Sequence, residues 1–353
     1  MLRVMQEIFD DRTGNLRFRA GGIYAVLVVA NVAAWAWALL AFRHYPVLLG
    51  TALLAYGFGL RHAVDADHIA AIDNVTRKLM QEGKRPAAVG FFFSLGHSTV
   101  VVLASVAIAA TATAFQDRFG AFRNVGAVVG TAVSALFLLA IAAMNIVILI
   151  AVYRTFRRVK AGKPYVDEDL NMLLAGRGLL SRLFRPMFRM IQRSWHMYPL
   201  GLLFGLGFDT ATEIGLLGIS AAQGSQGLSI WSILVFPTLF TAGMSLVDTT
   251  DSLLMLGAYG WAFLKPIRKL YYNLTITLVS VVVAVLIGGI EAFGLVGGQF
   301  GLKGAFWDGI GALNDNFGMV GYLIIAFFVL SWIASAAIYR LRGYDRLEIT
   351  ASR

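Results

Sequence analysis

Cysteine is absent from the 353 residues of this chain, and charged residues make up only 14% of it. The absence of cysteine excludes disulfides, thiolate metal sites and cysteine nucleophiles, so a bound metal must take imidazole, carboxylate, hydroxyl or backbone oxygen ligands. Soluble domains usually carry about 25% charged residues, whereas 58% of this chain is hydrophobic. The composition therefore indicates an integral membrane protein.

Sequence signatures of ATP hydrolysis and of zinc proteolysis are also missing. The chain has no Gly-x-x-x-x-Gly-Lys-Ser/Thr segment and no His-Glu-x-x-His segment. Although the net charge is +10, the basic residues form no single stripe with aromatic partners, which argues against nucleic acid. We expect no enzyme activity, no cofactor and no nucleic-acid partner, and we expect membrane lipids around the protein.

Long apolar runs are abundant. About 20 predominantly apolar residues span a bilayer as a helix, and eight segments meet this requirement: residues 22–43, 46–73, 87–112, 126–153, 199–220, 230–258, 271–297 and 319–340. The sequence thus predicts an all-α polytopic membrane protein with eight transmembrane helices. Residues 1–353 are expected to form a single transmembrane domain, which includes a basic loop at 154–198.

The distribution of basic residues predicts how the chain is oriented. Of the 30 Lys and Arg residues, 25 lie in the N-terminal segment, the 74–86 loop, the 154–198 loop, the 265–269 turn and the C-terminal tail. Positively charged loops stay on the cytoplasmic side. Both termini are therefore expected on the cytoplasmic side of the membrane. The 154–198 loop is interpreted as an ordinary basic cytoplasmic loop.

Four polar clusters lie at membrane depth, where each charge costs roughly 2.5–3.5 kcal/mol and usually marks an ion path or ligand site. They are residues 61–73, His97-Ser98, residues 209–213 and residues 248–251. Imidazole beside carboxylate is a ligand set for a divalent transition metal. We predict that His62, Asp65 and His68 supply part of a Ni²⁺ or Co²⁺ site, which His97 and carboxylates elsewhere complete or connect to a path.

Helical spacing separates Asp67 from the neighbouring residues of this site. On a continuous helix, His62, Asp65 and His68 share a face about 120° wide, while Asp67 lies on the other side. If Gly57 and Gly59 help to unwind the helix, this separation no longer holds. We therefore expect a distorted second helix.

The clusters at 209–213 and 248–251 each contain two carboxylates. Asp209 and Glu213 are spaced i, i+4, and Asp248 and Asp251 are spaced i, i+3, so each pair lies on one face of a helix. Like charges at these spacings repel unless a cation or a proton intervenes, which favours a cation path. The residues predicted to line this path are Ser98, Asp209, Thr210, Glu213, Asp248 and Asp251.

Short similarities favour an internal repeat. Phe58-Gly59-Leu60 recurs as Phe204-Gly205-Leu206, and Phe93-x-x-Gly96 recurs as Phe240-x-x-Gly243. The predicted helices 2 and 3 then correspond to helices 5 and 6, which run in the opposite direction. Such an inverted repeat is common in transporters.

The four clusters belong to longer blocks that resemble the nickel/cobalt transporter family of bacterial permeases. The blocks read Arg61-His-Ala-Val-Asp-Ala-Asp-His-Ile69, Leu95-Gly-His-Ser-Thr-Val-Val101, Leu206-Gly-Phe-Asp-Thr-Ala-Thr-Glu213 and Gly243-Met-Ser-Leu-Val-Asp-Thr-Thr-Asp251. The resemblance implies a high-affinity permease with eight helices that lies in the cytoplasmic (inner) membrane of a bacterium and carries Ni²⁺ or Co²⁺ as its substrate. It also implies that His62, Asp67 and His68 are essential and that Asp65 contributes. Asp67 is therefore included in the predicted metal site, either as a ligand on a distorted helix or as a residue that orients a ligand.

Two alternatives differ from an importer of Ni²⁺ or Co²⁺. Export relatives carry a His-rich cytoplasmic segment, whereas the 154–198 loop contains only His196, so import is favoured over efflux by the same family. A membrane-embedded metal-dependent hydrolase is disfavoured, because the polar clusters are spread over several helices as a path requires. The sequence does not rank Ni²⁺ against Co²⁺, because selectivity depends on site geometry.

Overall fold

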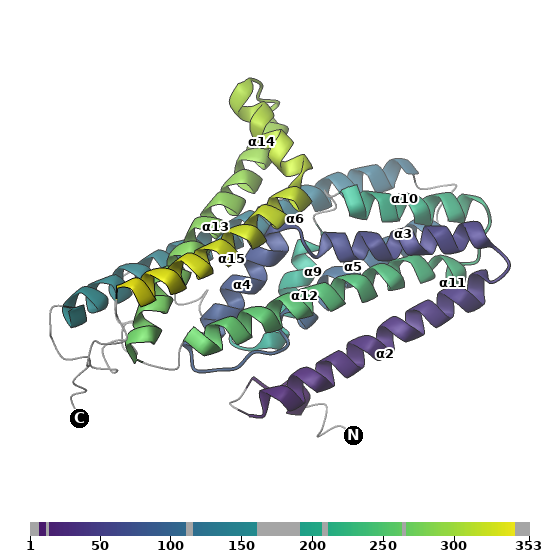
Figure 1. Cartoon of the computed structure of the whole chain (residues 1–353). Helices are drawn as coiled ribbons and strands as arrows, with labels where there is room; N and C mark the ends of the chain where they lie inside the picture. Colours follow the sequence, from purple (N-terminus) through teal and green to yellow (C-terminus); the bar gives the residue numbers. More distant parts are fainter. Residues whose placement is uncertain are drawn as a thin grey trace.

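A computed structural model describes residues 7–11, 14–110, 116–160, 191–206, 211–262 and 266–342, and within them the chain is helical without strands. Figure 1 shows the helices as an elongated bundle. Their bounds are α2 Leu16–Phe42, α3 Pro46–His62, α4 Ala66–Gln81, α5 Val89–Ala110, α6 Gln116–Lys160, the 3₁₀ turn η1 Ser194–His196, α9 Met197–Phe204, α10 Ala211–Ser225, α11 Ile230–Ile233, α12 Val235–Ala262, α13 Pro266–Phe300, α14 Ala305–Asp315 and α15 Phe317–Leu341.

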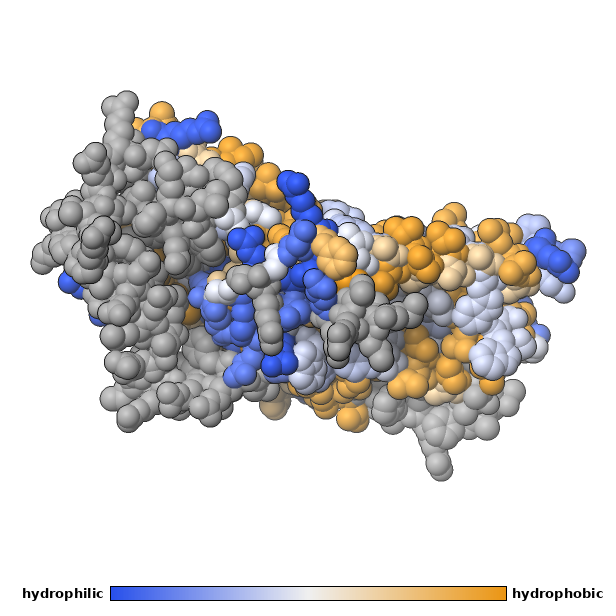
Figure 2. Space-filling view, turned by 90° about the horizontal axis from the view of Figure 1, so that it is seen from below, coloured by the Kyte–Doolittle hydropathy of each residue, from blue (hydrophilic) through white to orange (hydrophobic). Residues whose placement is uncertain are grey.

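Six of the described helices are long and apolar enough to cross a membrane, and the bent pair α3–α4 makes a seventh candidate. These seven coincide with seven of the eight predicted spans. The remaining one, 199–220, falls on α9 and α10 and on residues 207–210, which lie outside the described part. The protein is thus a multi-pass membrane protein, and hydrophobic residues cover much of the right half of the face in Figure 2.

The second predicted span is bent, which confirms the expected distortion. Helix α3 ends at His62, α4 begins at Ala66, and the two axes differ by 50°. The break lies at residues 63–65, beyond the two glycines at 57 and 59. Asp65 has an extended backbone (φ −65°, ψ 147°) and is the N-cap residue of α4.

Helix α4 continues past the predicted end of the span at residue 73 and reaches Gln81. Its last turns are buried together with the charged Arg77, whose guanidinium donates to the Thr277 hydroxyl and to the Asn74 side chain at 3.2 Å. A buried charge is tolerated where such partners exist. The residues predicted to begin a loop are therefore part of the bundle.

Two close helix crossings surround the centre of the bundle. A Cβ atom at Gly59 of α3 would lie 2.1 Å from the Phe240 carbonyl oxygen of α12. A Cβ atom at Gly201 of α9 would lie 2.1 Å from the Phe93 carbonyl oxygen of α5. Only glycine permits this approach of two backbones, and the approach brings the polar residues of α3, α5 and α12 together.

Candidate metal site

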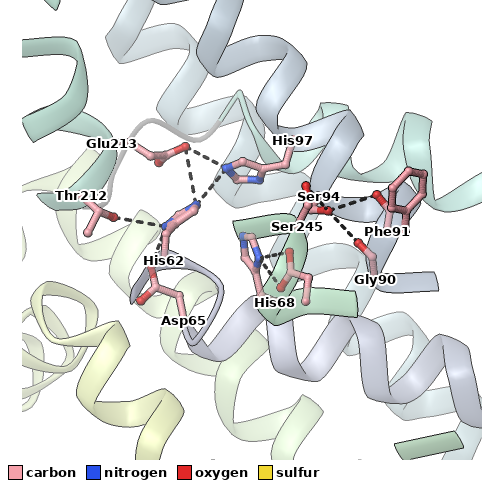
Figure 3. Close-up of polar contacts among 11 residues, drawn as sticks. His62, Asp65, His68, Gly90, Phe91, Ser94, His97, Thr212, Glu213 and Ser245 are labelled. Atoms are coloured by element: carbon pink, nitrogen blue, oxygen red, sulfur yellow. Dashed lines mark hydrogen bonds and ion pairs between the residues drawn. The ribbon is translucent and has the colours of Figure 1, made fainter. Parts of the chain in front are cut away.

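Three histidines from three helices converge at the break between α3 and α4 (Figure 3). His62 ends α3, His68 lies in the beginning of α4, and His97 lies in the middle of α5. Their ring centroids are 4.7–4.8 Å apart in every pair, and one nitrogen from each ring lies within 4.8 Å of the others. All three are at most 3% exposed. This arrangement fits one metal ion between the three rings.

In two of the histidines, His62 and His68, a carboxylate lies at the ring nitrogen that faces away from the cluster. Asp65 Oδ2 lies 2.8 Å from His62 Nδ1, and both carboxylate oxygens of Asp248 lie 3.3 Å from His68 Nδ1. A carboxylate on one ring nitrogen keeps its proton there and leaves the other nitrogen to ligate a metal. His68 Nε2 accordingly has no hydrogen-bond partner within the described residues.

Glu213 brings a further carboxylate to the same point. It lies in the first turn of α10, is 1% exposed, and places Oε1 at 2.9 Å from His97 Nε2 and at 3.8 Å from His62 Nε2. The two imidazole nitrogens are 2.9 Å from each other. Nitrogen and carboxylate oxygen atoms that face one point inside an apolar bundle form a cation site.

Several predicted residues make no described hydrogen bond to the three histidines. Asp67 is partly exposed in the first turn of α4, where its charge acts on His62 and His68 without a described hydrogen bond. Ser98 is buried, and its Oγ is unpartnered among the described residues. Asp251 lies one turn beyond Asp248 on α12.

The structure also adds one residue to the site and leaves two undescribed. Thr212 Oγ1 lies 3.3 Å from His62 Nδ1; its place beside Glu213 in the third polar block is the signal that could have identified it. Asp209 and Thr210, both predicted to line the path, lie outside the described residues. Asp248 was predicted as a path residue, and its contact with His68 makes it part of the site as well.

Comparison with known proteins gives one family for most of the chain. Residues 48–338 match the NicO family, described as high-affinity nickel-transport protein. A high-affinity nickel transport protein of Cupriavidus necator is 61% identical over 351 residues, which cover 99% of this chain and 100% of that protein.

Two further relatives have different names. The hydrogenase nickel incorporation protein HupN of Bradyrhizobium diazoefficiens is 54% identical over 90% of this chain and 83% of its own length. The cobalt transport protein NhlF of Rhodococcus rhodochrous is 41% identical over 84% of both chains. No solved structure matches the chain. The resemblance found in the polar blocks thus extends over nearly the whole sequence, and the chain belongs to the NicO family of high-affinity nickel-transport proteins.

Proposed function

We propose that this protein is a secondary permease that imports Ni²⁺ or Co²⁺ across the bacterial cytoplasmic membrane. The observation that carries the proposal is the buried His62–His68–His97 cluster, in which the Nε2 atom of His68 has no described partner. Imidazole suits Ni²⁺ and Co²⁺. The names of the relatives, which include nickel and cobalt transport proteins, support the same substrates.

Three histidine Nε2 atoms and one Glu213 oxygen are the proposed ligands of the ion. Asp65 and Asp248 are proposed to orient the ligands without contacting the ion, because each carboxylate lies at the Nδ1 atom of a ligating ring. Asp67 contributes charge near the site. Ser98, Asp209, Thr210 and Asp251 remain proposed residues of the path between the site and the two membrane surfaces.

The membrane potential supplies enough energy for this transport. A divalent cation that moves inward across 100 mV gains about 2 × 2.3 kcal/mol, which corresponds to roughly thousandfold accumulation. The chain itself contains no P-loop for ATP. The proposed import therefore needs no hydrolytic subunit.

We also propose eight spans in which α9 and α10 form the fifth, with both termini in the cytoplasm. The glycine crossings support an inverted repeat. Gly243 of α12 faces the carbonyl oxygen of Tyr56 in α3, and Gly96 of α5 faces that of Tyr198 in α9. Helices α3 and α5 of the first half thus cross α12 and α9 of the second half in the same way.

For α3 and α9, these crossings favour one alignment of the two helices, and the sequence similarity favours another. The two alignments differ by one helical turn. The contacts match Tyr56-x-x-Gly59 with Tyr198-x-x-Gly201, whereas the short similarity matched Phe58 with Phe204. The second helices keep the predicted register of Phe93 with Phe240.

Uptake of radioactive nickel and cobalt by cells that express the chain tests the proposal. We expect accumulation above that of cells without it, and background accumulation for His62→Ala at an equal amount of membrane protein. Asp308→Asn, on the exposed part of α14, is the matched control and is expected to transport normally. Unchanged accumulation on expression would remove the permease, and faster loss of preloaded metal would assign efflux instead.

A further inference from the structure

Two phenylalanines cover the histidine cluster. The Phe93 ring of α5 meets the His68 ring edge-on, with centroids 4.8 Å apart. The Phe240 ring of α12 lies 5.5 Å from the His62 ring. Both phenylalanines are fully buried, so their rings pack inside the bundle and do not face lipid. Each ring thus covers a different histidine.

The two phenylalanines belong to separate apolar clusters. Phe93 lies in a cluster that extends to Leu79 of α4 and Met197 of α9, next to the basic loops. Phe240 lies in a cluster that extends to Ala52 of α3 and Val235, the first residue of α12. The polar site is therefore enclosed between two apolar layers. Apolar constrictions of this kind stop ions because they exclude the water of hydration.

The same two residues correspond to each other in the proposed inverted repeat, as the first residues of Phe93-x-x-Gly96 and Phe240-x-x-Gly243. Both phenylalanine carbonyls also lie at the glycine crossings. Matching residues of an inverted repeat lie on opposite sides of the membrane midplane. One ring consequently faces each membrane surface.

We propose that Phe240 is the outer gate and Phe93 the inner gate of the metal site. The proposal rests on the permease function and the orientation proposed above. In the structure both rings lie against histidines, so the site is closed on both sides. Import then requires Phe240 to move away from His62 for the ion to arrive, and Phe93 to move away from His68 for the ion to leave.

The absence of native cysteine makes a direct test feasible with one introduced thiol. Thr212→Cys places this thiol beside His62, because the native hydroxyl lies 3.3 Å from His62 Nδ1. A charged, membrane-impermeant methanethiosulfonate reagent measures access from outside in intact cells and from inside in inverted vesicles. The rate of modification is compared with and without a second substitution.

Phe240→Ala is expected to raise the rate from outside only, and Phe93→Ala the rate from inside only. An increase of about tenfold or more is expected, because loss of a buried phenylalanine side chain weakens a packed state by more than that factor. Phe236→Ala is the matched control for the outer gate, since its ring is buried in α12 but stacks on Phe42 at 5.4 Å. Phe92→Ala, whose ring packs on Phe9, is the control for the inner gate.

If the alanine variants do not fold, Phe240→Leu and Phe93→Leu are tested instead. They are expected to raise the modification rate from the same sides by smaller factors. Equal increases from both sides, or no increase in folded variants, would overturn the gates. So would an increase with Phe236→Ala equal to that with Phe240→Ala. Protection of the introduced thiol by NiCl₂ in the chain without gate substitutions separately tests the metal site. Lack of protection would contradict the proposed function rather than the gates.

Discussion

Replacement of Asp248 by asparagine tests how the bundle prepares His68 for a metal ion. The Asp248 side chain is buried, and both of its oxygens lie 3.3 Å from His68 Nδ1. Its charge keeps the proton on Nδ1 and leaves Nε2 for the ion. Asparagine has the same size but no charge. Its amide can donate to Nδ1, which moves the proton to the nitrogen that should bind the metal.

The expected effect follows from the position of Asp248 behind a ligand rather than in contact with the ion. Substitution of such partners weakens metal binding by about 10- to 100-fold, equal to about 1.4–2.8 kcal/mol. We expect this rise in the Ni²⁺ dissociation constant of the purified Asp248→Asn protein, measured by isothermal titration calorimetry. Asp308→Asn removes an exposed carboxylate of the same type and should bind Ni²⁺ like the native chain.

Two results would refute the reasoning. An unchanged dissociation constant in folded Asp248→Asn protein would mean that Asp248 does not prepare His68 for the metal. A loss of binding as large as that caused by His68→Ala would mean that the carboxylate itself contacts the ion. The comparison therefore distinguishes a supporting carboxylate from a ligand.

Three further substitutions test other parts of the structure. Glu213→Gln keeps the shape of a side chain that lies 2.9 Å from His97 Nε2 but removes its charge, so nickel uptake should fall to background while the folded protein is retained. Normal uptake would exclude Glu213 as a ligand. Asp67→Asn removes a partly exposed charge near the site, so the nickel concentration for half-maximal uptake should rise while the maximal rate is kept; a lost maximal rate would make Asp67 a direct ligand. Gly59→Ala should abolish monodisperse protein in size-exclusion chromatography, because a Cβ would lie 2.1 Å from the Phe240 carbonyl oxygen, whereas Gly57→Ala has open space and should fold. Equal yields of the two variants would argue against the close crossing of α3 and α12.

The local part of the site was predictable from sequence because its spacing is short. His62, Asp65 and His68 are separated by three residues each, and a helix or a distorted helix brings them together in either case. The helical-wheel separation of Asp67 from the other three assumed a continuous helix, and the break at residues 63–65 removes that assumption. The position of the break was less predictable, because residues 63–65 contain no glycine or proline and the bend depends on packing around it.

The long-range pairs could not be derived from spacing. Asp248 meets His68 across 180 residues, and Glu213 meets His97 across 116 residues. Sequence could place these carboxylates at membrane depth, but their partners depend on how α12 and α10 pack against α4 and α5. Arg77 was expected in a loop for a similar reason, because its buried partner Thr277 is 200 residues away.

X-ray absorption spectroscopy of the purified protein loaded with one equivalent of Ni²⁺ tests the central claim most directly. The account predicts imidazole scattering from three histidines together with oxygen ligands, and loss of one imidazole in each of the variants His62→Ala, His68→Ala and His97→Ala. A nickel ion bound by oxygen alone, or a spectrum unchanged by all three substitutions, would contradict the claim that these histidines hold the transported metal.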